Sequence, residues 1–199
     1  MSQHCLIVVD VQNDFCPGGA LAVPGGDEIV PHVNSLISEF DHVVLTQDWH
    51  PSGHASFASL YPGRKPFDTI ELNYGTQVLW PDHCVQGSHG AAFHADLRTD
   101  KAELIVRKGF RHGMDSYSAF FENDRETPTG LAGYLRERGI ISVTLCGLAF
   151  DYCVGFSALD AASAGFATAV IAHACRAIDD HGSAVHMRAG LVDAGVELV

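Results

Sequence analysis

The sequence lacks several features that mark particular classes of protein. Lys and Arg number 12 against 24 Asp and Glu, a formal net charge of −12, so a basic face for nucleic acid is not expected. No apolar run approaches the ~18 residues of a membrane-spanning helix, and the N-terminus lacks a basic leader. Six cysteines in 199 residues are too few for a disulfide scaffold. We therefore expect a soluble cytoplasmic protein with reduced thiols and no nucleic-acid or membrane partner.

The composition that remains is typical of one globular domain. At ~150 residues per domain, the chain forms a single domain over residues 1–199 with room for a sizeable core. Hydrophobic residues make up 47% and charged residues 18%, which excludes a disordered chain. Twelve histidines are unusually many and raise the question of a metal site.

Strand and helix patterns alternate along the chain. Continuous apolar runs, typical of parallel strands buried on both faces, lie at residues 5–11, 42–47, 103–107, 142–147 and 167–172, with a short last strand at 196–199. Helical patterns lie at residues 27–40, 129–138, 152–164 and 181–189. This alternation predicts an α/β domain with a mainly parallel sheet.

Residues 49–102 form an insertion that interrupts this alternation. The segment is rich in Gly, Pro, Ser and His and has little periodicity, and long irregular insertions in compact domains are usually functional. In open α/β sheets the ligand binds outside the carboxyl ends of the strands. The functional site is therefore expected just after the strands and in this insertion.

Reactive side chains follow four of the predicted strands. In strand order they are Asp10, then Asp48 with His50, then Lys108, then Cys153. Cys153 lies in the first turn of a predicted helix, where the helix dipole and free N–H groups favour a thiolate and can bind an oxyanion. Asp10 can accept the thiol proton, and Lys108 can compensate its charge. The alternative is that Cys153 is a small buried hydrophobe.

Asp48 and His50 are candidate metal ligands, because side chains at i and i+2 of an extended segment point to the same side. Two ligands do not complete a site, so the insertion must supply more. Its remaining candidates are His54, His83, Cys84, His89 and His94. Histidine with carboxylate suits Zn, Fe or Mn, although each isolated histidine can equally be a surface or hydrogen-bonded imidazole.

Six short blocks, spread in order over almost the whole chain, carry a resemblance to a known family. They are residues 9–15 (VDVQNDF), 46–51 (TQDWHP), 80–85 (WPDHCV), 108–109 (KG), 115–120 (DSYSAF) and 147–154 (GLAFDYCV). Together they resemble the nicotinamidase/pyrazinamidase branch of the isochorismatase-like cysteine hydrolase superfamily. No block is specific alone, but six in the family's order are. The two blocks with metal-ligand residues distinguish this branch from isochorismatases proper.

The resemblance implies a role for each matched residue. The implied catalytic triad is Asp10, Lys108 and Cys153. The implied oxyanion hole is the backbone N–H groups of Ala149 and Cys153, with a cis peptide bond between Leu148 and Ala149. The implied substrate contacts are Phe15, Trp80, Tyr117 and Leu148. The implied metal ligands are Asp48, His50 and His83, and His54 is left open as a further contact, directly or through water.

The resemblance also implies a fold and an activity. The fold is a three-layer Rossmann-like α/β fold, a six-stranded parallel sheet with helices on both faces. The activity is hydrolysis of nicotinamide to nicotinate and ammonia, and of pyrazinamide to pyrazinoate, through a cysteine thioester in NAD salvage. The cofactor is one divalent metal ion, with zinc first and iron or manganese as alternatives. Relatives occur as monomers and as higher assemblies, so a homo-oligomer is among the expectations.

Three other interpretations are weighed against this one. A related cysteine amidase acting on a carbamoyl or ureido substrate would keep the triad but would not need the metal ligands. A nucleotide-binding module would need a Gly-rich first turn, whereas the chain has DVQNDF at residues 10–15. A structural zinc protein would need a closed four-ligand shell without an organised thiol beside it.

Overall fold

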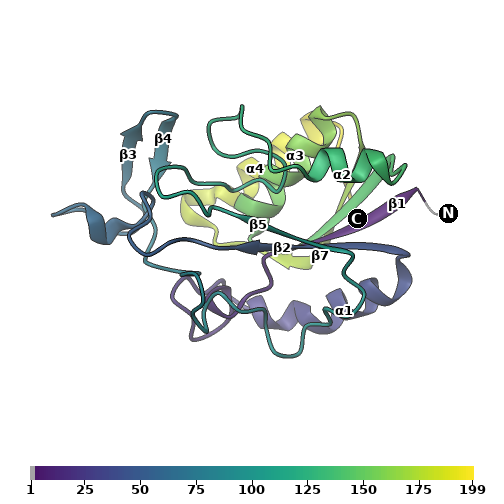
Figure 1. Ribbon diagram of the computed structural model, residues 1–199, viewed down its shortest axis with the longest axis horizontal. Helices are drawn as coiled ribbons and strands as arrows, with labels where there is room; N and C mark the ends of the chain where they lie inside the picture. The colour runs from purple at the N-terminus through teal and green to yellow at the C-terminus, as the bar shows by residue number, and fades with distance from the viewer. Residues whose placement is uncertain (1–2) are drawn as a thin grey trace.

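The computed structural model describes residues 3–199 and contains the six-stranded sheet that the sequence pattern and the resemblance predict. The order across the sheet is β5-β2-β1-β6-β7-β8, and all neighbouring pairs are parallel (Figure 1). The strands are β1 (His4–Val9), β2 (His42–Asp48), β5 (Leu104–Lys108), β6 (Ser142–Leu148), β7 (Ala167–Arg176) and β8 (Glu197–Leu198).

Helices cover both faces of the sheet, as expected, although unequally. They are α1 (Val30–Glu39), α2 (Leu131–Glu137), α3 (Gly155–Ser163) and α4 (Ser183–Asp193). Helix α1 lies on one face and α2, α3 and α4 lie on the other (Figure 1). The chain runs from β1 outward to β2 and β5, then returns and runs the other way through β6, β7 and β8. Parallel crossovers are right-handed, so a reversal of direction changes the face on which the connections lie. The connections from β1 to β2 and from β2 to β5 therefore lie on one face, and those from β5 through β6 and β7 to β8 lie on the other.

The insertion at residues 49–102 makes the crossover from β2 to β5 without an α-helix; it has only a short 3-10 helix at Ala58–Leu60. It contains a separate antiparallel hairpin, β3 (Thr69–Leu72) and β4 (Gly75–Val78), which the sequence pattern did not predict. Its later part packs on α1, where the Asn34 amide donates to the Asp96 carbonyl at 2.8 Å and accepts from the Arg98 N–H at 2.8 Å.

Several element boundaries differ from the prediction: β7 continues to Arg176 and α4 to Asp193, each four residues past the predicted end. Two further differences have local reasons. Strand β1 ends at Val9, two residues early, because Asp10 adopts a left-handed φ of 48° that turns the chain out of the sheet. Helix α3 is preceded by a π-helical turn, Phe150–Val154, so the regular helix begins at Gly155 instead of residue 152. π-Helical turns inside helices are frequent at functional sites.

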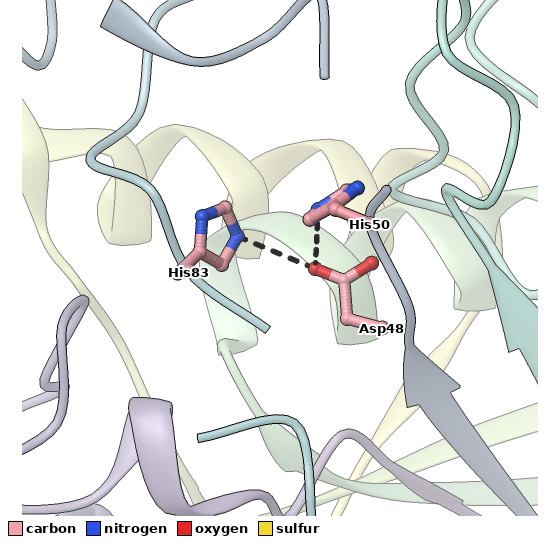
Figure 2. A group of neighbouring side chains, drawn as sticks. All are labelled: Asp48, His50 and His83. Atoms are coloured by element: carbon pink, nitrogen blue, oxygen red, sulfur yellow. Dashed lines mark hydrogen bonds and ion pairs between the residues drawn. The ribbon is translucent and has the colours of Figure 1, made fainter. Parts of the chain in front are cut away.

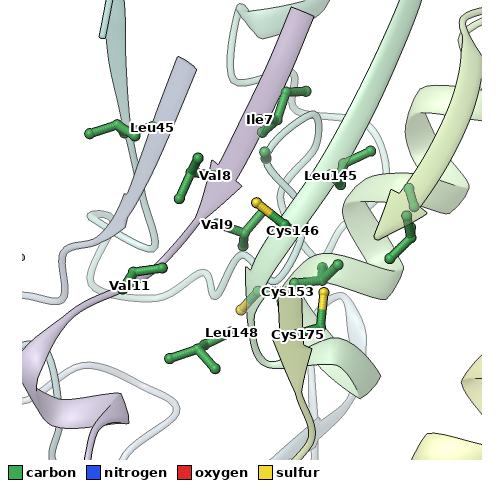
Figure 3. Close-up of a cluster of buried hydrophobic side chains, with 14 of the residues drawn as sticks. Ile7, Val8, Val9, Val11, Leu45, Leu145, Cys146, Leu148, Cys153 and Cys175 are labelled. Atoms are coloured by element: carbon green, nitrogen blue, oxygen red, sulfur yellow. The ribbon is translucent and has the colours of Figure 1, made fainter. Parts of the chain in front are cut away.

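The core lies on both faces of the central strands, as the unbroken apolar runs predict. Cys5–Val9 of β1 is buried throughout, and all six cysteines of the chain are free and buried. Strands β1 and β6 approach so closely that a Cβ on Gly147 would lie 2.1 Å from the Val9 carbonyl oxygen. Cys153 lies at the end of this cluster, beyond the last residues of β1 (Figure 3). Among residues 3–199, no helix is long and apolar enough to cross a membrane.

Candidate active site

The candidate site lies where the strand order reverses. Asp10 follows β1 and Cys153 follows the neighbouring strand β6, while Asp48 ends β2 and Lys108 ends β5. The carboxyl ends of parallel strands meet at one edge of a sheet, and ligands of open α/β folds bind at the point where the order reverses. The structure therefore brings together the strand-end residues that the sequence analysis singles out.

Lys108 contacts both carboxylates and the thiol of this group. Its Nζ lies 2.8 Å from Asp10 Oδ2, 3.0 Å from Asp48 Oδ1 and 3.3 Å from Cys153 Sγ, and it donates to the Ser116 carbonyl at 3.1 Å. Burial by itself lowers the pKa of Lys108, but the Asp10 and Asp48 carboxylates raise it well above its usual value. Lys108 is therefore a permanent cation inside the protein, where it compensates two buried anions.

Burial opposes the thiolate that the helix start was expected to favour, so the Cys153 thiol needs a base. Burial raises the pKa of Cys153 well above its usual value, and Lys108 offsets only part of that effect. Burial also raises the pKa of Asp10, against the lowering effect of Lys108. The Thr46 hydroxyl donates to Asp10 Oδ1 at 2.6 Å and so orients the carboxylate. A carboxylate with a raised pKa is a better proton acceptor for the thiol.

The turn that carries Cys153 has the peptide geometry that the resemblance implies. The Leu148–Ala149 peptide bond is cis, and the π-helical turn Phe150–Val154 follows it at once. Ala149 and Cys153 both line the same pocket. The backbone N–H groups proposed as the oxyanion hole thus belong to residues on one wall of that pocket.

Asp48, His50 and His83 form a compact, buried group of metal-ligand side chains. Their ligand atoms all lie within 4.8 Å of one another. Asp48 Oδ2 lies 3.1 Å from His50 Nε2 and 3.4 Å from His83 Nε2, so the two imidazoles converge on one carboxylate oxygen (Figure 2).

Backbone carbonyls fix which nitrogen of each imidazole can bind a metal. His50 Nδ1 lies 2.9 Å from the Gly109 carbonyl oxygen, and His83 Nδ1 lies 2.8 Å from that of Pro81. With each Nδ1–H donating to its carbonyl, Nε2 is the nitrogen of each ring that faces the Asp48 carboxylate and can bind a metal ion. The donor set therefore fits a divalent ion such as Zn, Fe or Mn.

Gly109 makes room for the His50 ring. Its φ is 63°, and a Cβ at this position would lie 2.5 Å from His50 Cε1. Lys108 thus supplies the central cation. The next residue, Gly109, supplies the space for the His50 imidazole and the carbonyl that faces its Nδ1.

His54 packs against the metal-ligand group without facing it through a free nitrogen. Its Nδ1 lies 2.7 Å from Ser56 Oγ and its Nε2 lies 3.1 Å from the Met114 carbonyl oxygen. Its ring lies 4.2 Å from that of His50, centroid to centroid. Burial and the neighbouring His50 lower the pKa of His54. His50, His54 and Asp115 form a second group whose ligand atoms lie within 4.8 Å of one another, so His54 stays open as a further metal contact.

Aromatic side chains form much of a pocket in front of Cys153. Phe15, Trp80 and Tyr117 line it, as the resemblance implies. The pocket is also lined by Tyr152, whose ring lies 4.8 Å from that of Trp80 and 5.5 Å from that of Tyr117. Such walls suit a flat aromatic ring, and Asp48, His50 and His83 line the same pocket.

Leu148 does not line this pocket, although it is an expected substrate contact. Its side chain is fully buried in the hydrophobic core, where a Cβ on Gly26 would lie 3.3 Å from Leu148 Cδ1. Leu148 is the last residue of β6, and the next residue, Ala149, faces the pocket in its place.

Comparison with known proteins assigns this arrangement to a family. The Isochorismatase domain family matches residues 4–197. The chain belongs to the isochorismatase family. It is 56% identical over 194 residues to a nicotinamidase of Acinetobacter baylyi, covering 98% of this chain and 91% of that protein.

Two solved structures of this family are also similar. A nicotinamidase/pyrazinamidase of Acinetobacter baumanii superposes with a TM-score of 0.99 at 54% identity, covering 100% of this chain and 96% of that one. A pyrazinamidase of Pyrococcus horikoshii, solved in complex with zinc, superposes with a TM-score of 0.81 at 36% identity, covering 100% and 99%.

The sequence analysis did not identify several residues that support the site of this isochorismatase-family chain. The fully buried Gln12 side chain donates to the Asp48 carbonyl and accepts from the Asp48 N–H, both at 2.8 Å, and so fixes the backbone of a metal-ligand residue. Gln12 and Thr46 lie inside the matched blocks, which is the signal that could have found them. Other unpredicted pocket residues are Leu21, Asp115, Tyr152 and Ile178.

Proposed function

We propose that this protein is a nicotinamidase that hydrolyses nicotinamide to nicotinate and ammonia, and pyrazinamide to pyrazinoate, as a cytoplasmic step of NAD salvage. The observation that carries the proposal is the position of Lys108, in contact with Cys153, Asp10 and the metal-ligand residue Asp48. Lys108 thus links the proposed nucleophile, Cys153, to the metal-ligand group, and both line the same aromatic pocket. The identity to nicotinamidases along nearly the whole chain supports the same function.

The proposed binding mode follows from the pocket walls. The pyridine ring lies among Phe15, Trp80 and Tyr117, with the carboxamide toward Ala149 and Cys153. The N–H groups of those two residues would hold the carbonyl oxygen as negative charge develops on it. Asp48, His50 and His83 would hold one divalent ion, zinc in the first instance. When bound, the ion supplies a Lewis acid that the ring nitrogen can coordinate, which orients the substrate.

The first half of the reaction forms a thioester. Asp10 Oδ2 forms an ion pair with Lys108 Nζ at 2.8 Å, and because a carboxylate oxygen has two lone pairs, one remains for the Cys153 proton. Asp10 takes that proton as the sulfur attacks the carbonyl carbon and a C–S bond forms. Asp10 then returns the proton to the amide nitrogen, the C–N bond breaks, and ammonia leaves. Lys108 holds the Asp10 carboxylate in place and compensates its charge.

The second half hydrolyses the thioester. Asp10 removes a proton from a water molecule, and the hydroxide attacks the thioester carbon. The C–S bond breaks, the Cys153 sulfur recovers its proton from Asp10, and the product acid gives its carboxyl proton to solvent and leaves as nicotinate. Asp10 thus acts as base and acid in both halves, which its raised pKa suits.

Ammonia release with nicotinamide tests the proposal directly. We expect turnover by the native protein, a large loss after chelation, and recovery when Zn, Fe or Mn is returned. A carbamoyl or ureido substrate is the comparison, since it keeps the cleaved bond type but lacks a ring nitrogen for the metal. Turnover of that substrate without turnover of nicotinamide would replace this proposal with the carbamoyl amidase interpretation.

A further inference from the structure

Asp151 is a buried carboxylate that the proposed mechanism does not use. It lies between Ala149 and Cys153 in the π-helical turn and is 3% exposed. Its partners all come from residues 178–183, in the connection between β7 and α4. Oδ1 accepts from the Ile178 N–H at 3.0 Å, and Oδ2 accepts from the Asp179 N–H at 2.8 Å and the Ser183 hydroxyl at 2.5 Å.

The segment 177–183 has a backbone that needs such support. Asp179 and His181 adopt left-handed φ values of 56° and 50°, which are unfavourable for residues other than glycine. Asp179 is held from two sides, because its N–H donates to Asp151 and its carboxylate accepts from the Ala184 N–H at 3.3 Å. The His181 side chain is 94% exposed, and its Nε2 lies 3.6 Å from Asp180 Oδ1.

This segment also supplies part of the pocket. Ile178 lines the pocket together with Tyr152 and Cys153. Its N–H is bound by Asp151, two residues before the nucleophile. The carboxylate therefore ties one wall of the pocket, Ile178, to the turn that carries Cys153.

We propose that Asp151 is a positioning residue that fixes Ile178 as a wall of the ring pocket and so sets the affinity for a flat aromatic carboxamide. This inference rests on the proposed function for its substrate. Asp151 does not touch the reacting atoms and acts through the segment 177–183. Loss of its hydrogen bonds frees Ile178 and weakens ring binding, while the triad of Asp10, Lys108 and Cys153 keeps its own contacts.

A graded series of variants tests this role by steady-state kinetics with nicotinamide. Asp151→Asn puts an amide NH₂ where an acceptor is needed, and we expect KM to rise about tenfold with kcat changed less than about twofold. Ser183→Ala removes one donor of three and should raise KM by about twofold to threefold. Asp193→Asn is the matched control, because Asp193 is exposed at the end of α4, outside the pocket lining and the partners of Asp151, and its kinetics should match the native protein.

A double-mutant cycle separates the positioning role from a general structural one. Ile178→Ala alone should raise KM, and adding Ser183→Ala or Asp151→Asn to it should raise KM little further, because the same wall is already lost. Additive effects would overturn the proposal. So would a fall in kcat with unchanged KM in the Asp151→Asn protein, since that result would place Asp151 in support of the nucleophile instead. If Asp151→Asn does not fold, the Ser183→Ala and Ile178→Ala cycle decides alone.

Hydrogen exchange provides a test that needs no substrate. The amides of Ile178 and Asp179 should be protected in the native protein and should exchange at least about tenfold faster in the Asp151→Asn protein. Equal protection in both proteins would overturn the proposal even if nicotinamide is hydrolysed. Loss of protection in a protein that never hydrolyses nicotinamide would uphold the Asp151 contact and reject the proposed function.

Discussion

The Lys108 ammonium and the Asp48 carboxylate lie 3.0 Å apart, Nζ to Oδ1, while the other oxygen of Asp48 faces the Nε2 atoms of His50 and His83. One side chain therefore belongs to both halves of the site. His50 and Lys108 hold the pKa of Asp48 well below its usual value, although burial alone would raise it. The carboxylate stays ionised between a lysine and a group of metal ligands, so the proposed triad and metal site are parts of one arrangement.

Replacing Lys108 with methionine tests how far this charge balance supports the fold. Lys108→Met leaves Asp10 and Asp48 buried without their shared cation. We expect the free energy of unfolding to fall by about 3–5 kcal/mol, measured by urea denaturation. Lys65→Met, at an exposed position, is the matched control and should change it little. A Lys108→Met protein as stable as the native one would show that the two carboxylates need no cation.

His83→Ala tests the metal ligands. The variant removes one of the three buried donors, so we expect it to lose its metal and to bind nicotinamide with a higher KM. Elemental analysis of the purified protein measures the first effect and steady-state kinetics the second. His89→Ala, in the same insertion but exposed, should keep the metal content of the native protein. Unchanged metal in the His83→Ala protein would remove His83 from the ligand set.

Glu103 links the start of β5 to β2 and α2 through a carboxylate whose pKa is shifted. Burial raises the pKa, but Tyr134 and His42, at 2.9 and 2.8 Å, bring it below its usual value. A lowered folded-state pKa stabilises the protein above the unfolded-state pKa, and this contribution is lost as the pH falls through the folded-state value. Because Glu103 is exposed and its contacts are screened by solvent, Glu103→Gln should lower the free energy of unfolding by only a few tenths of a kcal/mol, roughly 0.2–0.5 kcal/mol, at neutral pH.

Urea denaturation over a range of pH measures the effect of Glu103→Gln. The difference from the native protein should shrink as the pH falls below ~4 and vanish where Glu103 is protonated in both states. Glu126→Gln, at an exposed position, should show no such dependence. If the difference in free energy of unfolding between the two proteins stays constant with pH, the Glu103 charge does not contribute to the stability of the fold.

The sheet could be predicted from the sequence because its strands are buried on both faces. Such strands appear as unbroken apolar runs, and parallel order puts their last residues at one edge, which is why Asp10, Asp48, Lys108 and Cys153 could be grouped from one sequence. The end of β1 was misplaced by two residues because Asp10 turns the chain with a left-handed φ that no apolar pattern reveals. The β3–β4 hairpin was missed because it lies apart from the main sheet, within an irregular segment.

The rest of the site depends on contacts between distant segments. His83 lies 33 positions after His50, and spacing alone gave it no preference over His54 or His89 until the resemblance did. Ile178 lines the pocket and its N–H donates to Asp151, a contact that spans 27 residues and leaves no local pattern. Leu148 was expected to contact the substrate, but the end of β6 turns it into the core and presents Ala149 to the pocket.

The most direct test of the account is ammonia release from nicotinamide by the Cys153→Ala protein, beside the native protein and under saturating metal. The thiol is the one side chain proposed to form a bond with the carbonyl carbon, and its removal leaves the aromatic pocket and the metal ligands in place. We predict that turnover is abolished while nicotinamide still binds, as measured by calorimetry. Substantial ammonia release by Cys153→Ala would contradict the covalent mechanism and with it the central role given to Lys108.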